Sequence, residues 1–261
     1  MNKRIERHYY IDLIRGIAFI LMAIDHLIFD IAYLFNSYWG KLFPKEFYLN
    51  DIVRLLQKYR FSDISTIIRM VFIAFVFLFI SGISSVLSRN ILKRGLRLFL
   101  ISLGLSLITI IIYLFTKNIT IIIYFGILHC ISISMLLTPL FKRVNKIILL
   151  IIALLIIGTG IYLSINTIYL NTNLLAPFNL TKPTFTTGDY YPVLPFMGFY
   201  ILGYIFGDWY FIQKKKPRVT NNYKNNILTY FGKNTLVWYF LHQIIVVVFL
   251  VIITLVNLLF V

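Results

Sequence analysis

The sequence predicts an all-α, polytopic transmembrane helical bundle. Of its 261 residues, 60% are hydrophobic and 13% are charged, whereas soluble domains carry about 25% charged residues. Several apolar runs reach the roughly 20 residues that a helix needs to cross a bilayer. No internal repeat or Gly/Ser-rich linker divides the chain, so we expect a single transmembrane domain over residues 1–261.

The hydrophobic runs predict about seven membrane spans, with edges defined to within a few residues. They lie near residues 11–35, 64–87, 95–116, 119–140, 146–167, 191–211 and 235–259. The first run follows three basic residues, as in a signal peptide, but it is too long and has no small-residue cleavage site. We therefore expect it to remain as the first helix.

The charge distribution predicts the topology. The formal net charge is +16, and assigning alternate loops to the cytosol places 17 of the 25 Lys and Arg residues inside and 8 outside. This bias follows the positive-inside rule and predicts a cytosolic N-terminus in the cell membrane, with the C-terminus outside. Because topology accounts for the basic charge, no nucleic-acid partner is expected. Cys130 is the only cysteine, so neither an intrachain disulfide nor a Cys-based metal site is expected.

Polar residues form a stripe along the first span. At about 100° per residue, Arg15 lies at roughly 300° from Asp12, His26 at roughly 320°, and Asp30 returns close to 0°. Asp25 lies roughly 100° away from His26. Titratable groups are costly in lipid and indicate function by default. His26 is therefore the candidate base, with Asp30 one turn further on as the candidate group that orients it.

Two further histidines lie inside predicted spans, His129 in the fourth and His242 in the seventh. From the helical rise, His26 lies roughly 18 Å from the cytosolic boundary, His129 roughly 12 Å from the outer boundary, and His242 roughly 10 Å from the cytosolic boundary. The three could line one path across the membrane. The alternative for each is a hydrogen-bonded residue that tightens helix packing.

A basic cluster follows the second span at its predicted cytosolic end. Its members are Arg89, Lys93, Arg94 and Arg97, with no acidic residue nearby. Guanidinium groups pair with phosphate oxygens in a bidentate geometry, but such a cluster also suits anionic lipid headgroups or topology alone. Four serines, at positions 81, 84, 85 and 88, share one face of the preceding helix and permit close helix approach.

Other segments have simpler interpretations. Residues 46–60 alternate apolar and charged side chains at helical spacing, which predicts an amphipathic helix on the outer surface. It is expected to be an interfacial anchor or a cap over a pocket. Residues 212–226 are expected to form a flexible cytosolic hinge. Gly203 and Gly207 form a helix-packing motif.

Several stretches together resemble the bacterial members of the heparan-α-glucosaminide N-acetyltransferase catalytic-domain family. They are Asp12-x-x-Arg15-Gly16 followed by His26 and Asp30; Phe77-Leu-Phe-x-Ser81-Gly82; Lys93-Arg94-Gly95; Phe125-Gly126-Ile-Leu-His129; Asp189-Tyr-x-Pro-Val-Leu-Pro195 leading into Gly198; and Gly232, Leu236 and Leu241-His242-Gln243. Each piece alone is weak, but the set covers nearly the whole chain in the right order. The Ile-, Asn- and Lys-rich composition is also associated with AT-rich prokaryotic genomes.

The resemblance implies an integral-membrane acyltransferase that takes an acetyl group from cytosolic acetyl-CoA and meets a sugar acceptor from the outside. It implies that Arg89, Lys93, Arg94 and Arg97 hold the CoA phosphates. His26 would accept the proton from the acceptor, Asp30 would orient it, and His129 would stabilise the oxyanion or relay a proton. Asp189, Arg15 and His242 are the candidate acceptor-binding residues. No metal is expected. The relatives have more spans, so a homodimer is one way to complete the site.

The sequence therefore predicts glycan modification: transfer of an acyl group, most simply acetyl, to an extracytoplasmic saccharide hydroxyl or amine. A second class is a non-enzymatic transporter or ion relay that uses the intramembrane His and Asp residues. Such proteins often have internal repeats and helices broken mid-membrane, and neither is seen here. A third class is an inert assembly protein in which the polar stripe only fastens helices together.

Overall fold

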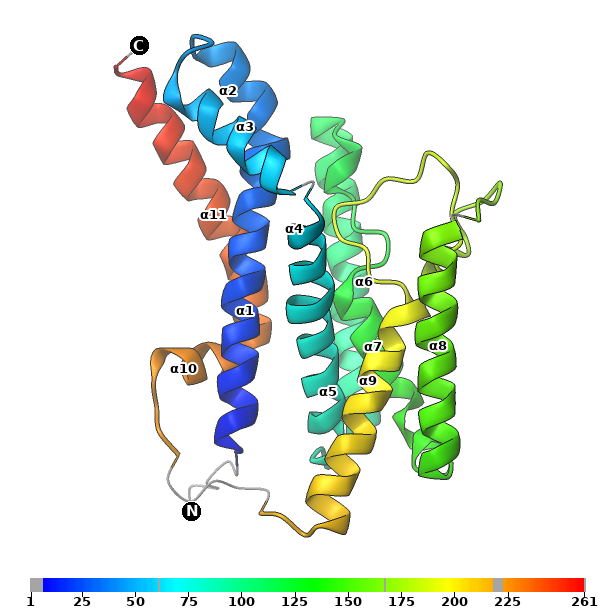
Figure 1. The fold of residues 1–261 in the computed structure, drawn as a ribbon. Coiled ribbons are helices and arrows are strands. Elements are labelled where there is room, and N and C mark those ends of the chain that lie inside the picture. The colour runs from blue at the N-terminus through cyan, green and yellow to red at the C-terminus, as the bar shows by residue number, and fades with distance from the viewer. Residues whose placement is uncertain (1–6, 61, 167, 218–222, 261) are drawn as a thin grey trace. The chain divides into compact units, whose positions relative to one another are not determined.

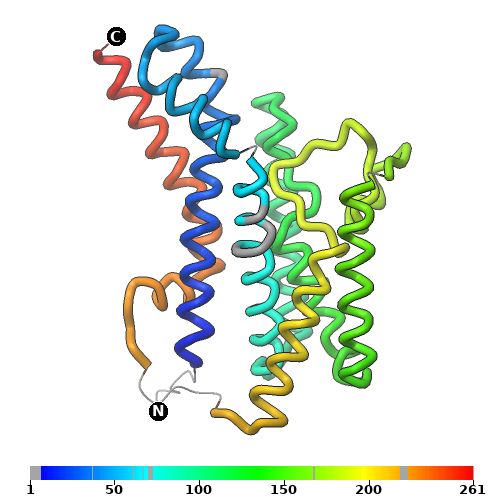
Figure 2. The backbone as a smooth tube through the Cα atoms, viewed as in Figure 1, coloured from blue at the N-terminus to red at the C-terminus, as the bar shows by residue number. Residues whose placement is uncertain are grey.

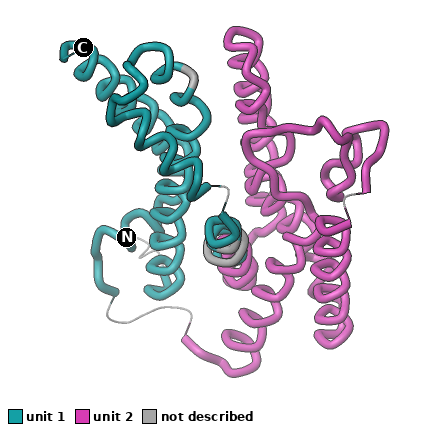
Figure 3. The backbone as a smooth tube through the Cα atoms, turned by 45° about the horizontal axis from the view of Figure 1, so that its top comes forward, with its two compact units in different colours: residues 1–76, 219–261 teal, residues 77–218 magenta. Residues whose placement is uncertain are grey.

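The all-α prediction is confirmed. The computed structural model describes residues 7–60, 62–166, 168–217 and 223–260 (Figure 1), and these form helices joined by turns and two isolated β-bridges. The described chain divides into two compact units, drawn in different colours in Figure 3. Unit 1 is Met1–Val76 with Val219–Val261, and unit 2 is Phe77–Arg218. The expectation of one domain over residues 1–261 stays a prediction.

Unit 1 is built around the first and last long helices of the chain. Helix α1 spans Tyr9–Phe29 and continues into the π-helix η1, Asp30–Phe35. It is followed by α2 (Asn36–Leu42), α3 (Tyr48–Arg60), α4 (Asp63–Ile67) and the π-helix η2 (Ile68–Phe75). After unit 2, the chain returns with α10 (Ile227–Lys233) and α11 (Thr235–Leu258). π-Helical turns are rare in proteins, and those that do occur are frequently found at functional sites.

Two glycines let α1 and α10 touch through their backbones. A Cβ added to Gly16 would lie 1.9 Å from the carbonyl oxygen of Leu228, and one added to Gly232 would lie 1.7 Å from that of Asp12. No other residue type fits at either position without moving a backbone. The contact fixes α10 against the N-terminal half of α1.

The predicted amphipathic helix is present as α3. Its apolar face, with Leu49 and Val53, packs into a core that also contains Trp39 of α2 and Leu250 of α11. The indole nitrogen of Trp39 donates a hydrogen bond to Thr254 Oγ1 at 2.7 Å. Helix α3 is therefore part of the hydrophobic core of unit 1 at the end of α1 where η1 begins.

Unit 2 packs its helices through small residues. It comprises α5 (Val76–Val86), α6 (Ile91–Thr116), η3 (Ile119–Ile121), α7 (Ile127–Phe141), α8 (Lys146–Asn166), η4 (Ala176–Phe178), α9 (Val193–Asp208) and η5 (Trp209–Gln213). A Cβ on Gly203 would lie 2.0 Å from the carbonyl oxygen of Phe79, and Gly207 lies against Ile83. The packing role expected of the Gly203 and Gly207 motif is thus confirmed, with α5 as the partner of α9.

Four described helices are long and apolar enough to cross a membrane, by length and composition. They are Tyr9–Phe35, Ile91–Thr116, Lys146–Asn166 and Thr235–Leu258. The predicted spans near 64–87 and 119–140 contain the shorter apolar helices Ile73–Val86 and Ile127–Phe141, and the one near 191–211 contains the 16-residue α9. The count of seven and the cytosolic N-terminus stay predictions.

One predicted helix begins much later than expected. After the short helix η3, the segment before α7 is extended rather than helical. The N–H groups of Gly188 and Tyr191 donate hydrogen bonds to the carbonyl groups of Ile122 and Phe125. Partners on a distant segment replace the intrahelical bonds, so apolar composition alone misplaced this helix start. The predicted hinge at 212–226 lies partly outside the described residues, because 218–222 are not described.

Candidate functional site

Two histidines of unit 1 lie ring against ring. The ring centroids of His26 on α1 and His242 on α11 are 4.9 Å apart, and the ring planes cross at 79°. Helices α1 and α11 pack against each other, as the blue and red-orange traces of Figure 2 show. His242 is buried and His26 is half-buried. The structure thus joins two candidates that the sequence had treated separately.

The backbone fixes which nitrogen of each ring is basic. His26 Nδ1 lies 2.8 Å from the carbonyl oxygen of Met22, and His242 Nδ1 lies 3.2 Å from that of Trp238. A carbonyl oxygen only accepts hydrogen bonds, so the neutral rings carry their proton on Nδ1. Nε2 is therefore the atom with the free lone pair on each ring. In the described structure, Nε2 of His242 is buried without a hydrogen-bond partner.

Asp30 is held by α11 rather than by His26. It is the first residue of η1, it is 1% exposed, and its Oδ2 accepts a hydrogen bond from Gln243 Nε2 at 2.7 Å. The described hydrogen bond of Asp30 is therefore to Gln243, and its role in orienting His26 stays a prediction. Nδ1 of His26 is already satisfied within its own helix, and a buried carboxylate needs a donor, which Gln243 supplies. The Oε1 atom of Gln243 is itself buried and unpartnered among the described residues.

Asp25 has cationic neighbours that the sequence analysis did not identify. Its Oδ1 lies 4.0 Å from Nη1 of Arg69 on η2, and Arg60 and His26 also act on it electrostatically. The Arg60 guanidinium lies over the ring of Phe29, 5.6 Å from its centroid. The sequence predicts only that an acidic residue inside a membrane span needs a cation or a hydrogen-bond donor as its partner. Which cation it would be depends on the folding of η2 onto α1.

Arg15 belongs to a different cluster, at the start of α1. Its Nη1 lies 3.2 Å from Asp12 Oδ1 and 3.3 Å from the carbonyl oxygen of Gly232. Tyr223 donates a hydrogen bond to Asp12 Oδ2 at 2.9 Å. Burial, together with this hydrogen bond and the charge of Asp12, raises the pKa of Tyr223 to about 12, so the hydroxyl remains a donor at neutral pH. The contacts place Arg15 among groups that fasten α10 and its preceding loop to α1.

His129 has the opposite tautomer from the unit 1 pair. Its Nδ1 accepts a hydrogen bond from the Gly126 N–H at 3.2 Å, so the neutral ring carries its proton on Nε2. Nε2 lies 3.3 Å from Ser106 Oγ, which itself donates to the Ile123 carbonyl at 2.7 Å. His129 therefore has no free lone pair with which to activate Ser106. Its contacts hold the turn into α7.

Asp189 caps the same helix from a distant segment. Its Oδ2 accepts a hydrogen bond from the Ile127 N–H at 3.1 Å, at the N-terminus of α7. A carboxylate is stabilised there by the orphan N–H groups and by the helix dipole. Asp189 and His129 thus lie at one end of α7, and the half-buried Asp189 is positioned by the extended pairing of residues 122–127 with 187–191.

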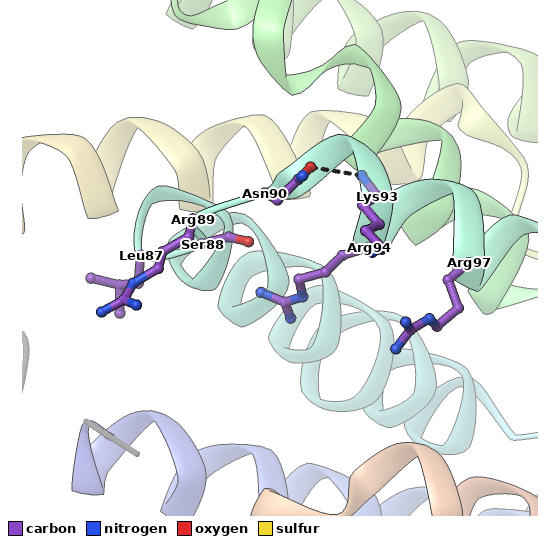
Figure 4. A pocket seen from close by; sticks show the side chains of 7 residues that line it. All are labelled: Leu87, Ser88, Arg89, Asn90, Lys93, Arg94 and Arg97. Atoms are coloured by element: carbon purple, nitrogen blue, oxygen red, sulfur yellow. Dashed lines mark hydrogen bonds between the residues drawn. The ribbon is translucent and has the colours of Figure 1, made fainter. Parts of the chain in front are cut away.

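The four basic candidates line a single pocket at the junction of α5 and α6 (Figure 4). Its volume is about 330 Å³, and its lining consists of Leu87, Ser88, Arg89, Asn90, Lys93, Arg94 and Arg97. No acidic residue is in this lining. The pocket adjoins the N-terminus of α6, where Asn90 Oδ1 accepts a hydrogen bond from the Lys93 N–H at 3.0 Å. Basic side chains at a helix N-terminus form a strongly anion-attracting environment.

Arg94 and Arg97 extend from the same side of α6, one helical turn apart, as Figure 4 shows. All four basic side chains are exposed, and Ser88 Oγ is buried without a partner in the described structure. The lining therefore supplies positive charge without an acidic residue. The described residues contain no group of three or more His, Cys, Asp and Glu side chains that could hold a metal ion.

The comparisons with known proteins identify a family. The family model described as "Heparan-alpha-glucosaminide N-acetyltransferase, catalytic" matches residues 7–244 of the chain. No curated protein and no solved structure matches it significantly. The matched range includes both histidines of the pair, the capped start of α7 and the basic pocket.

Proposed function

The chain belongs to the heparan-alpha-glucosaminide N-acetyltransferase catalytic family, and from that premise we propose that it transfers an acetyl group from cytosolic acetyl-CoA to an extracytoplasmic saccharide. The acceptor group is an amine or a hydroxyl. The membrane setting agrees with the four apolar helices long enough to span a bilayer. We place the protein in the cell membrane, with acceptor and donor on opposite sides.

The basic pocket is the observation that carries the proposal. Coenzyme A bears several phosphate groups, and arginine binds phosphate oxygens in a bidentate manner. Arg89, Lys93, Arg94 and Arg97 supply four cations without a neighbouring acid in the lining. The pocket volume lies at the lower end of the range for small-molecule sites, so we assign it the phosphate-bearing end of the donor. Each of these residues contributes binding and orientation.

His26 is the proposed general base. Its Nδ1 is held by Met22, which leaves Nε2 to accept a proton. In the reaction, the acceptor nitrogen or oxygen forms a bond to the acyl carbon and loses its proton to Nε2. The bond between the acyl carbon and sulfur breaks, and the thiolate takes up a proton. Asp30 is buried on η1, four residues further along the chain, and is proposed to help orient His26.

Asp189, His129 and Arg15 are proposed to act indirectly. The contacts of Asp189 and His129 favour a role in holding the loop that begins α7, and those of Arg15 favour a role in fixing α10.

The donor site is tested by measuring acetyl-CoA binding to the purified protein in nanodiscs. Replacing Arg94 by Ala should weaken binding about tenfold, because a charge-assisted hydrogen bond at an exposed site is lost. The difference in affinity between wild type and Arg94→Ala should become smaller as the salt concentration rises, because salt screens exposed charges. Arg143→Ala removes an exposed cation outside the pocket and is the matched control. Identical binding isotherms for wild type and Arg94→Ala would contradict donor binding by this cluster and would favour a role in membrane topology alone.

A proton or ion relay is the second candidate, and it is favoured by the contact between half-buried His26 and buried His242 and by the acids Asp25 and Asp30 on α1 and η1. A relay would move protons across the vesicle membrane without acetyl-CoA. Proteoliposomes with an internal pH dye distinguish the two. An acyltransferase leaves the internal pH unchanged after an external pH step, whereas a relay equilibrates it at a rate that depends on His26.

A further inference from the structure

The buried Nε2 atom of His242 has no assigned role. Buried polar atoms are almost always hydrogen-bonded, and an exception needs a physical explanation. His242 is 7% exposed and its Nδ1 is held by the Trp238 carbonyl, so its Nε2 offers a lone pair only. What this atom requires is a donor.

Such a donor appears when His26 takes up a proton. In the neutral state both rings carry their proton on Nδ1, and two Nε2 lone pairs cannot bond to each other. Protonated His26 has an N–H at Nε2 as well. Two imidazoles joined by an N–H···N bond of about 2.9 Å have centroids roughly 5 Å apart, and the observed separation is 4.9 Å.

We propose that His242 is a positioning residue for His26, whose Nε2 accepts a hydrogen bond from the Nε2–H of protonated His26, so that the two rings hold one proton between them. This inference rests on the proposed function, in which His26 is the base. The one lone pair of His26 Nε2 cannot face the acceptor and bond to His242 at the same time, so the pair releases its shared proton before His26 accepts the proton of the acceptor. His242 acts only through His26.

The surrounding charges favour one proton on the pair and disfavour two. Asp25 and Asp30 lie on α1 and η1, Arg60 of α3 acts on Asp25, and Arg69 of η2 lies 4.0 Å from it. Arg60 and Arg69 thus lie near Asp25, while Asp30 accepts a hydrogen bond from the neutral amide of Gln243. Tyr239, whose ring centroid lies 5.9 Å from that of His242, adds no charge at neutral pH. Two imidazoliums with centroids at 4.9 Å would repel strongly in a medium of low dielectric constant.

The first test is the pH dependence of acetyl transfer. His242→Phe keeps an aromatic ring beside His26 but removes the acceptor atom. A hydrogen bond to the charged form favours that form, so its loss should move the acid limb of the kcat/KM profile to lower pH by about one unit. Tyr239→Phe, which alters a neighbouring ring and leaves both histidines intact, is the matched control. An acid limb that stays in place or moves to higher pH in His242→Phe would overturn the proposal.

The second test does not depend on activity. Side-chain ¹⁵N NMR of histidine-labelled protein in nanodiscs should show both rings as Nδ1–H tautomers at high pH, and their Nε2 signals should move together as one proton binds. His242→Leu, which also lacks an acceptor atom, serves if His242→Phe does not fold. Independent titration of the two rings contradicts the sharing of a proton. Absence of acetyl transfer by the wild type, with joint titration preserved, would reject the proposed function and not the pair.

Discussion

Three buried or half-buried histidines differ in which nitrogen is free. His26 and His242 donate from Nδ1 to carbonyl groups of their own helices, whereas His129 accepts at Nδ1 from the Gly126 N–H. A free Nε2 lone pair makes a base, and a ring that is bonded at both nitrogens makes a structural bridge. The sequence provides the residue type, but the tautomer depends on local backbone groups. This is why residue identity alone could not separate the candidate base from the helix cap.

Asp189 should contribute to stability as a cap. Replacing it by Ala removes the acceptor for the Ile127 N–H and should lower the free energy of unfolding by about 1 kcal/mol. Asp189→Asn retains an acceptor oxygen and should lose less. Thermal unfolding in detergent measures the difference. A wild-type melting temperature in Asp189→Ala, together with a raised KM for the acceptor, would show instead that the carboxylate contacts the acceptor.

At the scale of elements, backbone contact between helices decides which glycines are required for packing. Gly16 and Gly232 allow α1 and α10 to approach, while Gly104 in α6 has no atom within 4 Å of an added Cβ. Both contact glycines belong to the stretches that resemble the family, and Gly104 does not. The sequence pattern therefore marked these positions, and the structure supplies the steric reason.

Gly16→Ala should destabilise the protein by about 1–3 kcal/mol, because the added methyl group overlaps the Leu228 carbonyl and forces the helices apart. Gly104→Ala is the control: it adds a methyl group in open space and should stabilise its helix slightly. Denaturation followed by circular dichroism compares the two. Equal stability of Gly16→Ala and wild type would contradict the close packing of α1 and α10.

The sequence located the long helices well and the interrupted ones poorly. Long uninterrupted helices such as Ile91–Thr116 contain their own hydrogen-bond partners, so composition is sufficient to find them. Residues 119–126 are also rich in apolar side chains, but the carbonyl groups of Ile122 and Phe125 accept hydrogen bonds from the N–H groups of Gly188 and Tyr191. Nonlocal pairing of this kind leaves no periodic signal. The same limit applies to Asp30, whose donor Gln243 lies near the other end of the chain.

At the scale of the whole molecule, the candidate chemistry is divided between the two units. Unit 1 carries the His26–His242 pair with Asp25 and Asp30, and unit 2 carries the capped start of α7 and the basic pocket. Charge and hydropathy alone indicated a basic cluster and a candidate base, and only the family resemblance assigned the cluster to the acyl donor. It could not indicate that His242 is the neighbour of His26, because that contact depends on the packing of the last helix against the first.

The account depends most on His26 acting as the base, and transfer across a vesicle membrane tests it most directly. Labelled acetyl-CoA is supplied on one side of reconstituted vesicles and a glucosaminide acceptor on the other, with wild type and His26→Gln compared after their folding is verified by circular dichroism. The account predicts that wild type labels the acceptor and that His26→Gln is slower by about 10²–10⁴-fold. Turnover by folded His26→Gln at the wild-type rate would contradict it.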